Sequence, residues 1–253
     1  MSHNTKSMKQ VKTGVSGLDS ILKGGIPEGS IIELSGVPGS GKTILALQFL
    51  LNSKEPSLFV SFEQDEANLQ NQAASIGSNI PPNVSVLFAQ DNTLEDLITK
   101  IESEVRRTKS TRLVIDSISS LINTVMTPSL SKELSESSRM SMGQTTVLPL
   151  FIDSEPQVRA IVWSLISRLR NLGCTTLLTS ELSRDSQYFS RDTISEFKVD
   201  GIVLLAPKTI GDRQEKTLQV VKMRYTDHDT DPHLLSITSS GVKVSKLYEV
   251  EEK

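Results

Sequence analysis

The sequence IIELSGVPGSGKTILALQFLL, residues 31–51, decides the fold. It joins an apolar strand pattern to a glycine-rich run and then to a helical pattern. The run from Gly36 to Thr43, GVPGSGKT, fits the spacing GxxxxGK[ST]. Its glycines let backbone N–H groups turn inward around a phosphate chain, Lys42 reaches the β- and γ-phosphates, and the Thr43 hydroxyl binds Mg²⁺. The segment therefore predicts a site for a nucleoside triphosphate with Mg²⁺.

The sequence around this segment alternates short β-branched runs with longer helical patterns, as repeated βαβ units do. Most of the strand runs are continuously apolar, which is typical of parallel strands buried on both faces. We expect strands at 31–35, 57–61, 84–88, 112–115, 175–179 and 201–205, and helices at 42–51, 66–76, 94–107 and 156–172. The pattern predicts an α/β fold in which helices flank a mostly parallel sheet.

The C-terminal part has a different pattern, because apolar and polar residues alternate and turn residues separate the runs. This favours antiparallel strands at the edge of the sheet, at 217–223, 234–238 and 242–244. The sequence contains no internal repeat. We therefore expect one domain over residues 12–247, preceded by a flexible polar lead-in at 1–11 and followed by a short tail at 248–253.

A segment rich in serine and threonine interrupts the alternation. Residues 127–146 hold nine Ser or Thr, and their two basic and two acidic side chains cancel in charge. Such a composition buries too little apolar surface to form a core. Composition favours a mobile surface loop, extending over about 127–155. The alternative is a loop that binds a protein partner and becomes ordered on contact.

The overall composition excludes several classes of protein. With 27 basic and 30 acidic residues the net charge is −3, so nucleic acid could bind only at a local basic patch. The single Cys174 cannot form an intramolecular disulfide, and no Cys/His spacing fits zinc. No stretch approaches the roughly 18 apolar residues of a membrane span. We expect a cytoplasmic protein without a signal peptide, zinc module or membrane segment.

Two carboxylates follow apolar strands and are candidates for chemistry on the triphosphate. Asp116 ends the strand LVID, where it could hold the metal. Glu63 closes the strand LFVSF, and at the same sheet edge it could polarise the attacking water. The residues alone leave Glu63 open, because an acid at the start of the following helix is also favoured by the helix dipole.

Further short motifs flank the glycine-rich run. TGVSGLD at 13–19 and LKGGIPEGS at 22–30 lead into it, and FVSFE at 59–63, VIDS at 114–117, CTTLLTSE at 174–181 and VKMR at 221–224 follow it. Together, over roughly residues 11–245, they resemble the RecA-superfamily core of KaiC-like and archaeal RadA-like ATPases. Lys222-Met223-Arg224, followed by Thr226 and His228, favours the KaiC-like side. The resemblance implies a single-domain RecA-like P-loop ATPase.

The resemblance also implies roles for individual residues. Glu63 would activate water; a second glutamate often follows it in KaiC-like proteins, whereas this chain has Gln64, so we expect slow turnover. Lys222 and Arg224 would cross a subunit interface to a neighbour's γ-phosphate, although such charges on an edge strand are often only solvated. The implied metal ligands are Thr43 and Asp116, and Ser180 with Glu181 would sense the γ-phosphate. The implied nucleotide contacts are Gly36, Pro38, Gly39, Ser40, Gly41, Lys42, Thr43, Ile44, Ser75, Ser180, Glu181, Thr226 and His228.

Three functions fit these features. The first is a Mg²⁺-dependent ATPase whose copies form a hexameric ring or a filament with ATP between subunits. The second is a regulatory switch that holds ATP with little turnover. The third is a recombination accessory that binds single-stranded DNA through loops such as 183–197, where basic and aromatic residues interleave but acidic residues offset the charge. DNA binding is not favoured, and it would fade steeply with salt, whereas nucleotide-driven assembly would not.

Overall fold

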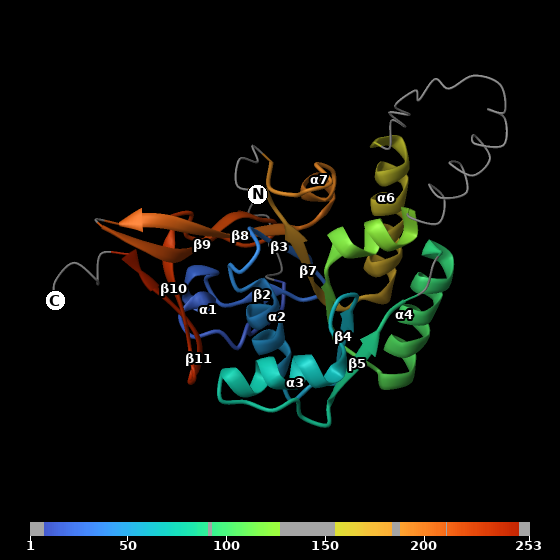
Figure 1. Ribbon diagram of the computed structural model, residues 1–253, viewed down its shortest axis with the longest axis horizontal. Helices are drawn as coiled ribbons and strands as arrows, with labels where there is room; N and C mark the ends of the chain where they lie inside the picture. Colours follow the sequence, from blue (N-terminus) through green and yellow to red (C-terminus); the bar gives the residue numbers. More distant parts are fainter. Residues whose placement is uncertain (1–7, 91–92, 127–154, 184–187, 211, 248–253) are drawn as a thin grey trace, which may run out of the picture.

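The central sheet has the predicted α/β arrangement. The structure, a computed structural model, describes residues 8–90, 93–126, 155–183, 188–210 and 212–247. Within these ranges nine strands form one sheet in the order β11-β10-β9-β8-β3-β7-β6-β4-β5 (Figure 1). The strands are β3 (Ile31–Gly36), β4 (Ser57–Ser61), β5 (Val84–Phe88), β6 (Arg112–Asp116), β7 (Thr175–Glu181), β8 (Gly201–Ile210), β9 (Arg213–Met223), β10 (His233–Thr238) and β11 (Gly241–Lys246).

The strand directions confirm the two patterns read from the sequence. β3 pairs in parallel with β7 and β8, and β4 pairs in parallel with β5 and β6. The three pairs formed by β8 with β9, β9 with β10, and β10 with β11 are antiparallel. The continuously apolar runs are thus the parallel strands, and the alternating runs are the antiparallel ones.

Helices cover both faces of the sheet (Figure 1). On one face α1 (Leu18–Ile21), α2 (Lys42–Leu51) and α3 (Glu66–Ser75) share a core with the side chains of Ile32 and Leu34. On the other face α4 (Leu94–Thr108), a helix over 118–126, α6 (Glu155–Leu172) and the short α7 (Ser195–Lys198) enclose a second core. Alternate residues of β3 enter opposite cores, as the two-residue period of a strand requires.

The structure differs from the sequence-based expectation in three places. Gln10–Val11, expected in the polar lead-in, form strand β1 and pair with β2 (Ile26–Pro27). β8 and β9 form a longer hairpin than expected, because their outer halves are polar and carry no apolar pattern. The short helices α1 and α7 carry too few residues to show a helical period. Most of the Ser-rich segment and residues 1–7 and 248–253 lie outside the described residues.

The parallel strands give the molecule two chemically different edges. Gly36, Ser61, Asp116 and Glu181 end β3, β4, β6 and β7, and we call the edge that they form the carboxyl edge. The opposite ends of the same strands form the amino edge. Ligands of open α/β sheets bind outside the carboxyl ends of strands, so the carboxyl edge is where a site is expected. No helix in the described part of the chain is long and apolar enough to cross a membrane.

Candidate functional site

The glycine-rich loop leaves the amino end of helix α2 open. Gly41 is the N-cap of α2 with φ of 106°, and no side chain among the described residues caps this helix. By contrast, Asp65 caps α3 and Thr93 caps α4 through hydrogen bonds to backbone N–H groups. The first N–H groups of α2 are therefore available to an anion, and the helix dipole favours negative charge there.

Lys42 lies buried between the glycine-rich loop and three carboxylates. Its Nζ donates hydrogen bonds to the carbonyl oxygens of Gly36 at 2.8 Å and Val37 at 3.1 Å. Burial lowers the pKa of Lys42, and the charges of Glu181, Asp116 and Glu63 act in the opposite direction. The fold thus places the loop lysine near Asp116 and Glu181, which end β6 and β7, and near Glu63, which follows β4.

Ser40 adds an unpaired hydroxyl to this loop. Its Oγ is buried and finds no hydrogen-bond partner within the described ranges. A buried hydroxyl without a partner destabilises the protein unless a ligand supplies one. Pro38 and Gly39 are exposed at the tip of the loop, whereas Ile44 packs against the core below it. This combination fits a phosphate chain.

Asp116 and Thr43 lie near each other and fit a metal ion bound partly by phosphate. Thr179 donates its hydroxyl hydrogen to Asp116 Oδ1, and the Thr43 hydroxyl is close enough to favour the ionised carboxylate and lower its pKa. Burial raises the pKa of Asp116, and a nearby cation would offset that effect. The described residues include no group of three or more His, Cys, Asp or Glu side chains suited to a metal. Mg²⁺ commonly needs only one or two protein ligands beside phosphate and water, so the pair is sufficient.

The Glu63 side chain is not the cap of the helix that follows it. Asp65 is the N-cap of α3, so Glu63 is not needed to stabilise that helix. Instead, Ser120 donates its hydroxyl hydrogen to Glu63 Oε1. Gln64, at the position of the second family glutamate, accepts a hydrogen bond from Gln72 of α3 at 2.8 Å. Of the two residues, only Glu63 carries a charge, and that charge acts on Lys42.

Ser180 and Glu181 lie on opposite sides of β7. Glu181 acts on Lys42, and its backbone N–H donates to Ser119 Oγ at 3.2 Å. Ser180 is fully buried, and its hydroxyl accepts a hydrogen bond from the backbone N–H of Arg191 at 3.4 Å. In this conformation Ser180 contacts the segment that follows β7, whereas Glu181 reaches the phosphate-binding side.

Lys222, Arg224, Thr226 and His228 lie at the other edge of the sheet, away from the glycine-rich loop of their own chain. Met223 pairs with Gly201, which pairs with Ile32 near the start of β3, whereas the loop follows Gly36 at its end. Lys222 donates to the carbonyl oxygens of Glu196 at 2.9 Å and Val199 at 2.8 Å.

Arg224, Thr226 and His228 likewise lie among residues of the amino edge of their own chain. Arg224 forms an ion pair with Asp200 at 3.6 Å, and Thr226 accepts from Gln10 at 3.1 Å. His228 Nε2 is buried and has no partner in the part of the chain that the structure describes. None of the four therefore reaches its own chain's phosphate-binding loop.

Ser75 lies at the end of α3, where it is exposed and donates to the Gln72 carbonyl at 2.7 Å. A Cβ atom on nearby Gly77 would lie 2.2 Å from the carbonyl oxygen of Ser239, in the turn between β10 and β11. A Cβ atom on Gly41 would lie 2.5 Å from Ile237 of β10. The β10–β11 hairpin therefore packs against both the end of α3 and the start of α2.

The sequence did not reveal Lys216. This β9 lysine donates to the carbonyl oxygen of Gly39 at 2.9 Å, so it lies over the glycine-rich loop. Its neighbours in β9 are polar, and such a pattern does not show which element a hairpin crosses. An open cleft of about 420 Å³ lies here between the loop and the hairpin, lined by Gly36–Ser40, Leu182, Ser183, Leu204–Pro207, Gln214 and Lys216.

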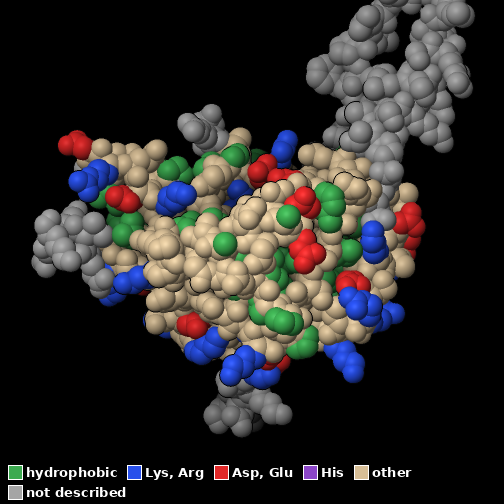
Figure 2. Space-filling view, turned by 60° about the horizontal axis from the view of Figure 1, so that its bottom comes forward, with side chains coloured by type: hydrophobic (Ala, Val, Ile, Leu, Met, Phe, Trp, Pro, Cys, Tyr) green, Lys and Arg blue, Asp and Glu red, His purple; other side chains and the backbone are tan. Residues whose placement is uncertain are grey.

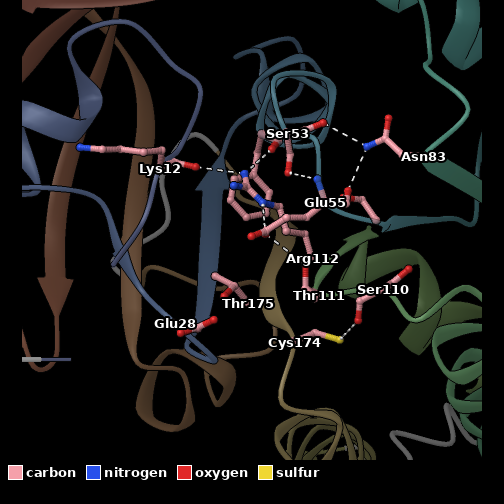
Figure 3. Close-up of polar contacts among 12 residues, drawn as sticks. Lys12, Glu28, Ser53, Glu55, Asn83, Ser110, Thr111, Arg112, Cys174 and Thr175 are labelled. Carbon is pink, nitrogen blue, oxygen red and sulfur yellow. Dashed lines mark hydrogen bonds and ion pairs between the residues drawn. The ribbon is translucent and has the colours of Figure 1, made fainter. Parts of the chain in front are cut away.

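The amino edge is built around a paired arginine (Figure 3). Arg112 donates to the carbonyl oxygens of Lys12 at 3.0 Å and Phe49 at 2.8 Å, and it forms an ion pair with Glu55 at 3.5 Å. Its guanidinium also lies 4.7 Å from the centre of the Phe49 ring. The carbonyl oxygens and the carboxylate leave little donor capacity for a ligand, so this cluster is structural.

The face in Figure 2 carries basic and acidic side chains that are interspersed around its rim. Among the described residues on this face, no basic stripe of the kind that tracks a nucleic-acid backbone is visible. The view gives no support to a nucleic-acid interface there.

Comparisons with known proteins give the family of the chain. A family model described as ATPase: KaiC matches residues 11–148 and 129–249. The UPF0273 protein of Thermotoga maritima is 31% identical, over 94% of this chain and 96% of its own length. The circadian clock oscillator protein KaiC of Thermosynechococcus vestitus is 28% identical over 96% of this chain, which spans only 45% of that protein. A crystal structure of a KaiC-like protein from Pyrococcus horikoshii matches with a TM-score of 0.76 and 26% identity, over 94% of this chain and 99% of its own.

Proposed function

This chain belongs to the KaiC ATPase family, and from that we propose that it binds ATP with Mg²⁺ at the carboxyl edge and hydrolyses it slowly. One observation carries the proposal: Lys42 lies at the uncapped amino end of α2, and carboxylates at or just after the ends of three strands act on that lysine. Phosphate would lie on the open N–H groups and the Ser40 hydroxyl, with Lys42 turning from its two carbonyl partners toward it. Thr43 and Asp116 would hold Mg²⁺, which neutralises charge on the phosphates when bound.

Glu63 is the residue suited to take a proton from water. It is exposed, accepts a hydrogen bond from Ser120, and lies at the edge where the phosphates are expected. The amide of Gln64 cannot act as a base, and it is engaged with α3. A single base fits slow turnover, and slow turnover is compatible with a role as an ATP-dependent switch.

The positions of Lys222 and Arg224 support assembly with ATP between copies. These cations are at the amino edge, so they cannot serve their own chain's nucleotide without a large rearrangement, but a neighbour stacked head to tail could receive them. Arg170, which pairs with Asp200, and Lys198 lie near them, and the chain exposes Trp163, Phe197 and Tyr225. Glu63, Asp65 and Glu66 are exposed near the opposite, carboxyl edge. Repetition of such a contact gives a ring or a filament, and the family resemblance favours a hexameric ring.

DNA binding is less well supported by the described residues. In the segment 188–197, Arg191 is next to Asp192, and Glu196 accepts hydrogen bonds from the N–H groups of Phe189 and Ser190. Arg184 and the 127–154 part of the proposed partner-binding loop lie outside the described residues. Nothing in the described segment forms the basic groove that single-stranded DNA requires.

The test measures phosphate release and mass in solution with and without ATP–Mg²⁺. We expect slow release and a larger, nucleotide-dependent assembly, both persisting at moderate salt. Assembly without phosphate release would favour the switch. Tight binding of a single-stranded oligonucleotide that disappears between low and moderate salt would favour the recombination accessory. Absence of any ATP binding would contradict the proposal.

A further inference from the structure

A carboxylic acid is buried in the middle of the sheet, on the strand that leads into the glycine-rich loop. Glu33 of β3 is fully buried, between Leu178 of β7 and Ile202 of β8. Its Oε1 accepts a hydrogen bond from Ser35 at 3.3 Å, and Oε2 has no partner among the residues described. An ionised carboxylate in this position would be strongly destabilising, so the group needs either a proton or a cation.

The polar groups around Glu33 come from three elements. The Ser35 hydroxyl donates to it, the hydroxyls of Ser180 and Ser195 are close enough to favour its ionised form, and Asp192 is close enough to act on it electrostatically. Glu196 of α7 and Lys222 of β9 are the other charged groups on this side, and Glu33 acts on the Lys222 charge. Burial first, and then the Asp192 charge, raise the pKa of Glu33 to about 8. At neutral pH the carboxyl group therefore carries a proton and can donate as well as accept.

The segment above Glu33 joins two parts of the ATPase machinery. Residues 188–197 follow β7, which ends at Glu181, and they lead through α7 to the carbonyl groups that hold Lys222. Arg191 fixes the segment to Ser180 through its N–H group. Asp192 accepts hydrogen bonds from the N–H and the hydroxyl of Ser195 at 2.6 and 2.9 Å.

We infer that Glu33, as the neutral acid, is a positioning residue that holds the segment 188–197 against β7 through the hydroxyls of Ser180 and Ser195. The segment in turn holds Lys222 for the neighbouring subunit and keeps β7 in place beside Lys42. This inference rests on the proposed ATPase function. Ionisation of Glu33 places a second negative charge beside Asp192, removes the group's capacity to donate a hydrogen bond to these hydroxyls, and loosens the segment.

The direction of the pH effect follows from the pKa. The ordinary value for glutamate is 4.5, and the folded protein keeps the proton to about pH 8. Folded wild type therefore binds more protons than the unfolded chain between these values, and its stability falls relative to the Glu33→Gln variant as pH rises through that window. Above about pH 8 the stability difference is constant, and the folded protein itself carries the ionised carboxylate.

The experiment compares wild type with Glu33→Gln and Glu33→Leu. Glutamine keeps the shape and hydrogen-bonding capacity without a proton to lose, and leucine keeps only the bulk. We expect the ratio of wild-type kcat to that of Glu33→Gln to fall about tenfold between pH 7 and 9, because the protonated fraction falls about tenfold per pH unit above the pKa. Glu33→Leu should be impaired at every pH. An unchanged ratio from pH 7 to 9, or full activity of a folded Glu33→Leu variant, would overturn the inference.

Hydrogen exchange supplies a readout that does not need ATPase activity. Amides of residues 188–197 should lose protection in wild type above pH 8 relative to Glu33→Gln measured at the same pH, while amides of α4 behave alike in both proteins. Equal protection of 188–197 in both proteins would overturn the inference even if ATP is hydrolysed. If wild type proved inactive toward ATP, the proposed function would fail, and exchange would still decide whether Glu33 holds the segment.

Discussion

The two edges of the parallel sheet differ in how their buried polar groups are paired. At the amino edge, Arg112 has carbonyl, carboxylate and ring partners, and Asp200 accepts from the N–H of Ile31 and from Arg170. At the carboxyl edge, Ser40 Oγ lacks a partner in the described structure, and α2 begins without a side-chain cap. The comparison indicates that the Arg112 and Asp200 clusters of the amino edge stabilise the fold, whereas the carboxyl edge retains polar groups at the glycine-rich loop that a ligand can satisfy.

The largest effect should come from Lys42→Ala at the carboxyl edge. We expect kcat/KM for ATP to fall at least about 10³-fold, because the ammonium group supports both phosphate binding and the charge of the transition state. Unfolding temperature should change little, since within the described residues the Lys42 ammonium hydrogen-bonds only to two loop carbonyls. Calorimetry and phosphate release measure the effect, with the exposed Lys54→Ala as control. A folded Lys42→Ala protein with wild-type ATP affinity would show that the ligand binds elsewhere.

Glu63→Gln separates chemistry from binding at the same edge. Turnover should slow by about 10²-fold or more while ATP affinity is retained, because general-base catalysis typically contributes about 10²–10⁴-fold. Single-turnover phosphate release measures the rate. Glu66→Gln, on an exposed residue in the first turn of α3, is the matched control and should behave as wild type. If Glu63→Gln hydrolyses ATP normally, another group is the base.

Arg112→Met, at the amino edge, should have the opposite effects: a less stable fold and intact ATP binding. We expect a loss of about 2–3 kcal/mol in the free energy of unfolding, because the carbonyl groups of Lys12 and Phe49 lose their donor. Affinity for ATP should stay unchanged. Urea denaturation measures the loss, and Arg107→Met, which removes an exposed pair with Glu104, is the control and should leave the free energy of unfolding close to that of wild type. Reduced ATP affinity in folded Arg112→Met would argue against separate roles for the edges.

A mixing experiment tests whether Arg224, although it lies at the amino edge, acts on the nucleotide of a neighbouring subunit. Arg224→Ala and Glu63→Gln, each nearly inactive alone, should recover roughly a quarter of wild-type activity when mixed equally, because that share of random interfaces pairs an intact base with an intact arginine. Normal hydrolysis by Arg224→Ala alone would make this arginine an ordinary partner of Asp200. Mixed assemblies without recovery would equally contradict a role in the neighbouring site.

Sequence reasoning worked where a local pattern carries the information. The apolar runs located every parallel strand, and the glycine-rich run located Lys42 and Thr43 because its spacing has a direct mechanical meaning. Glu63 needed the structure, since only the cap formed by Asp65 shows that the adjacent carboxylate is not required by the helix.

Other features depend on contacts between distant parts of the chain. The polar outer half of β9 does not reveal that Lys216 crosses the glycine-rich loop. Similarly, Glu33 lies in an otherwise apolar strand pattern, and its surroundings come from residues about 150 positions later in the sequence. Alternation of residue types fixes which face a side chain occupies, but not which loop covers it.

Hydrogen exchange with and without ATP–Mg²⁺ tests the division between the edges most directly. We predict new protection at residues 36–45, 61–66, 116–120 and 180–183 at the carboxyl edge, with residues 53–57 and 110–113 at the amino edge unchanged. If copies assemble, residues 195–200 and 222–224 should gain protection as well, and only at protein concentrations that permit assembly. Protection centred on the Arg112 cluster, or no protection of the glycine-rich loop at saturating ATP, would contradict the account.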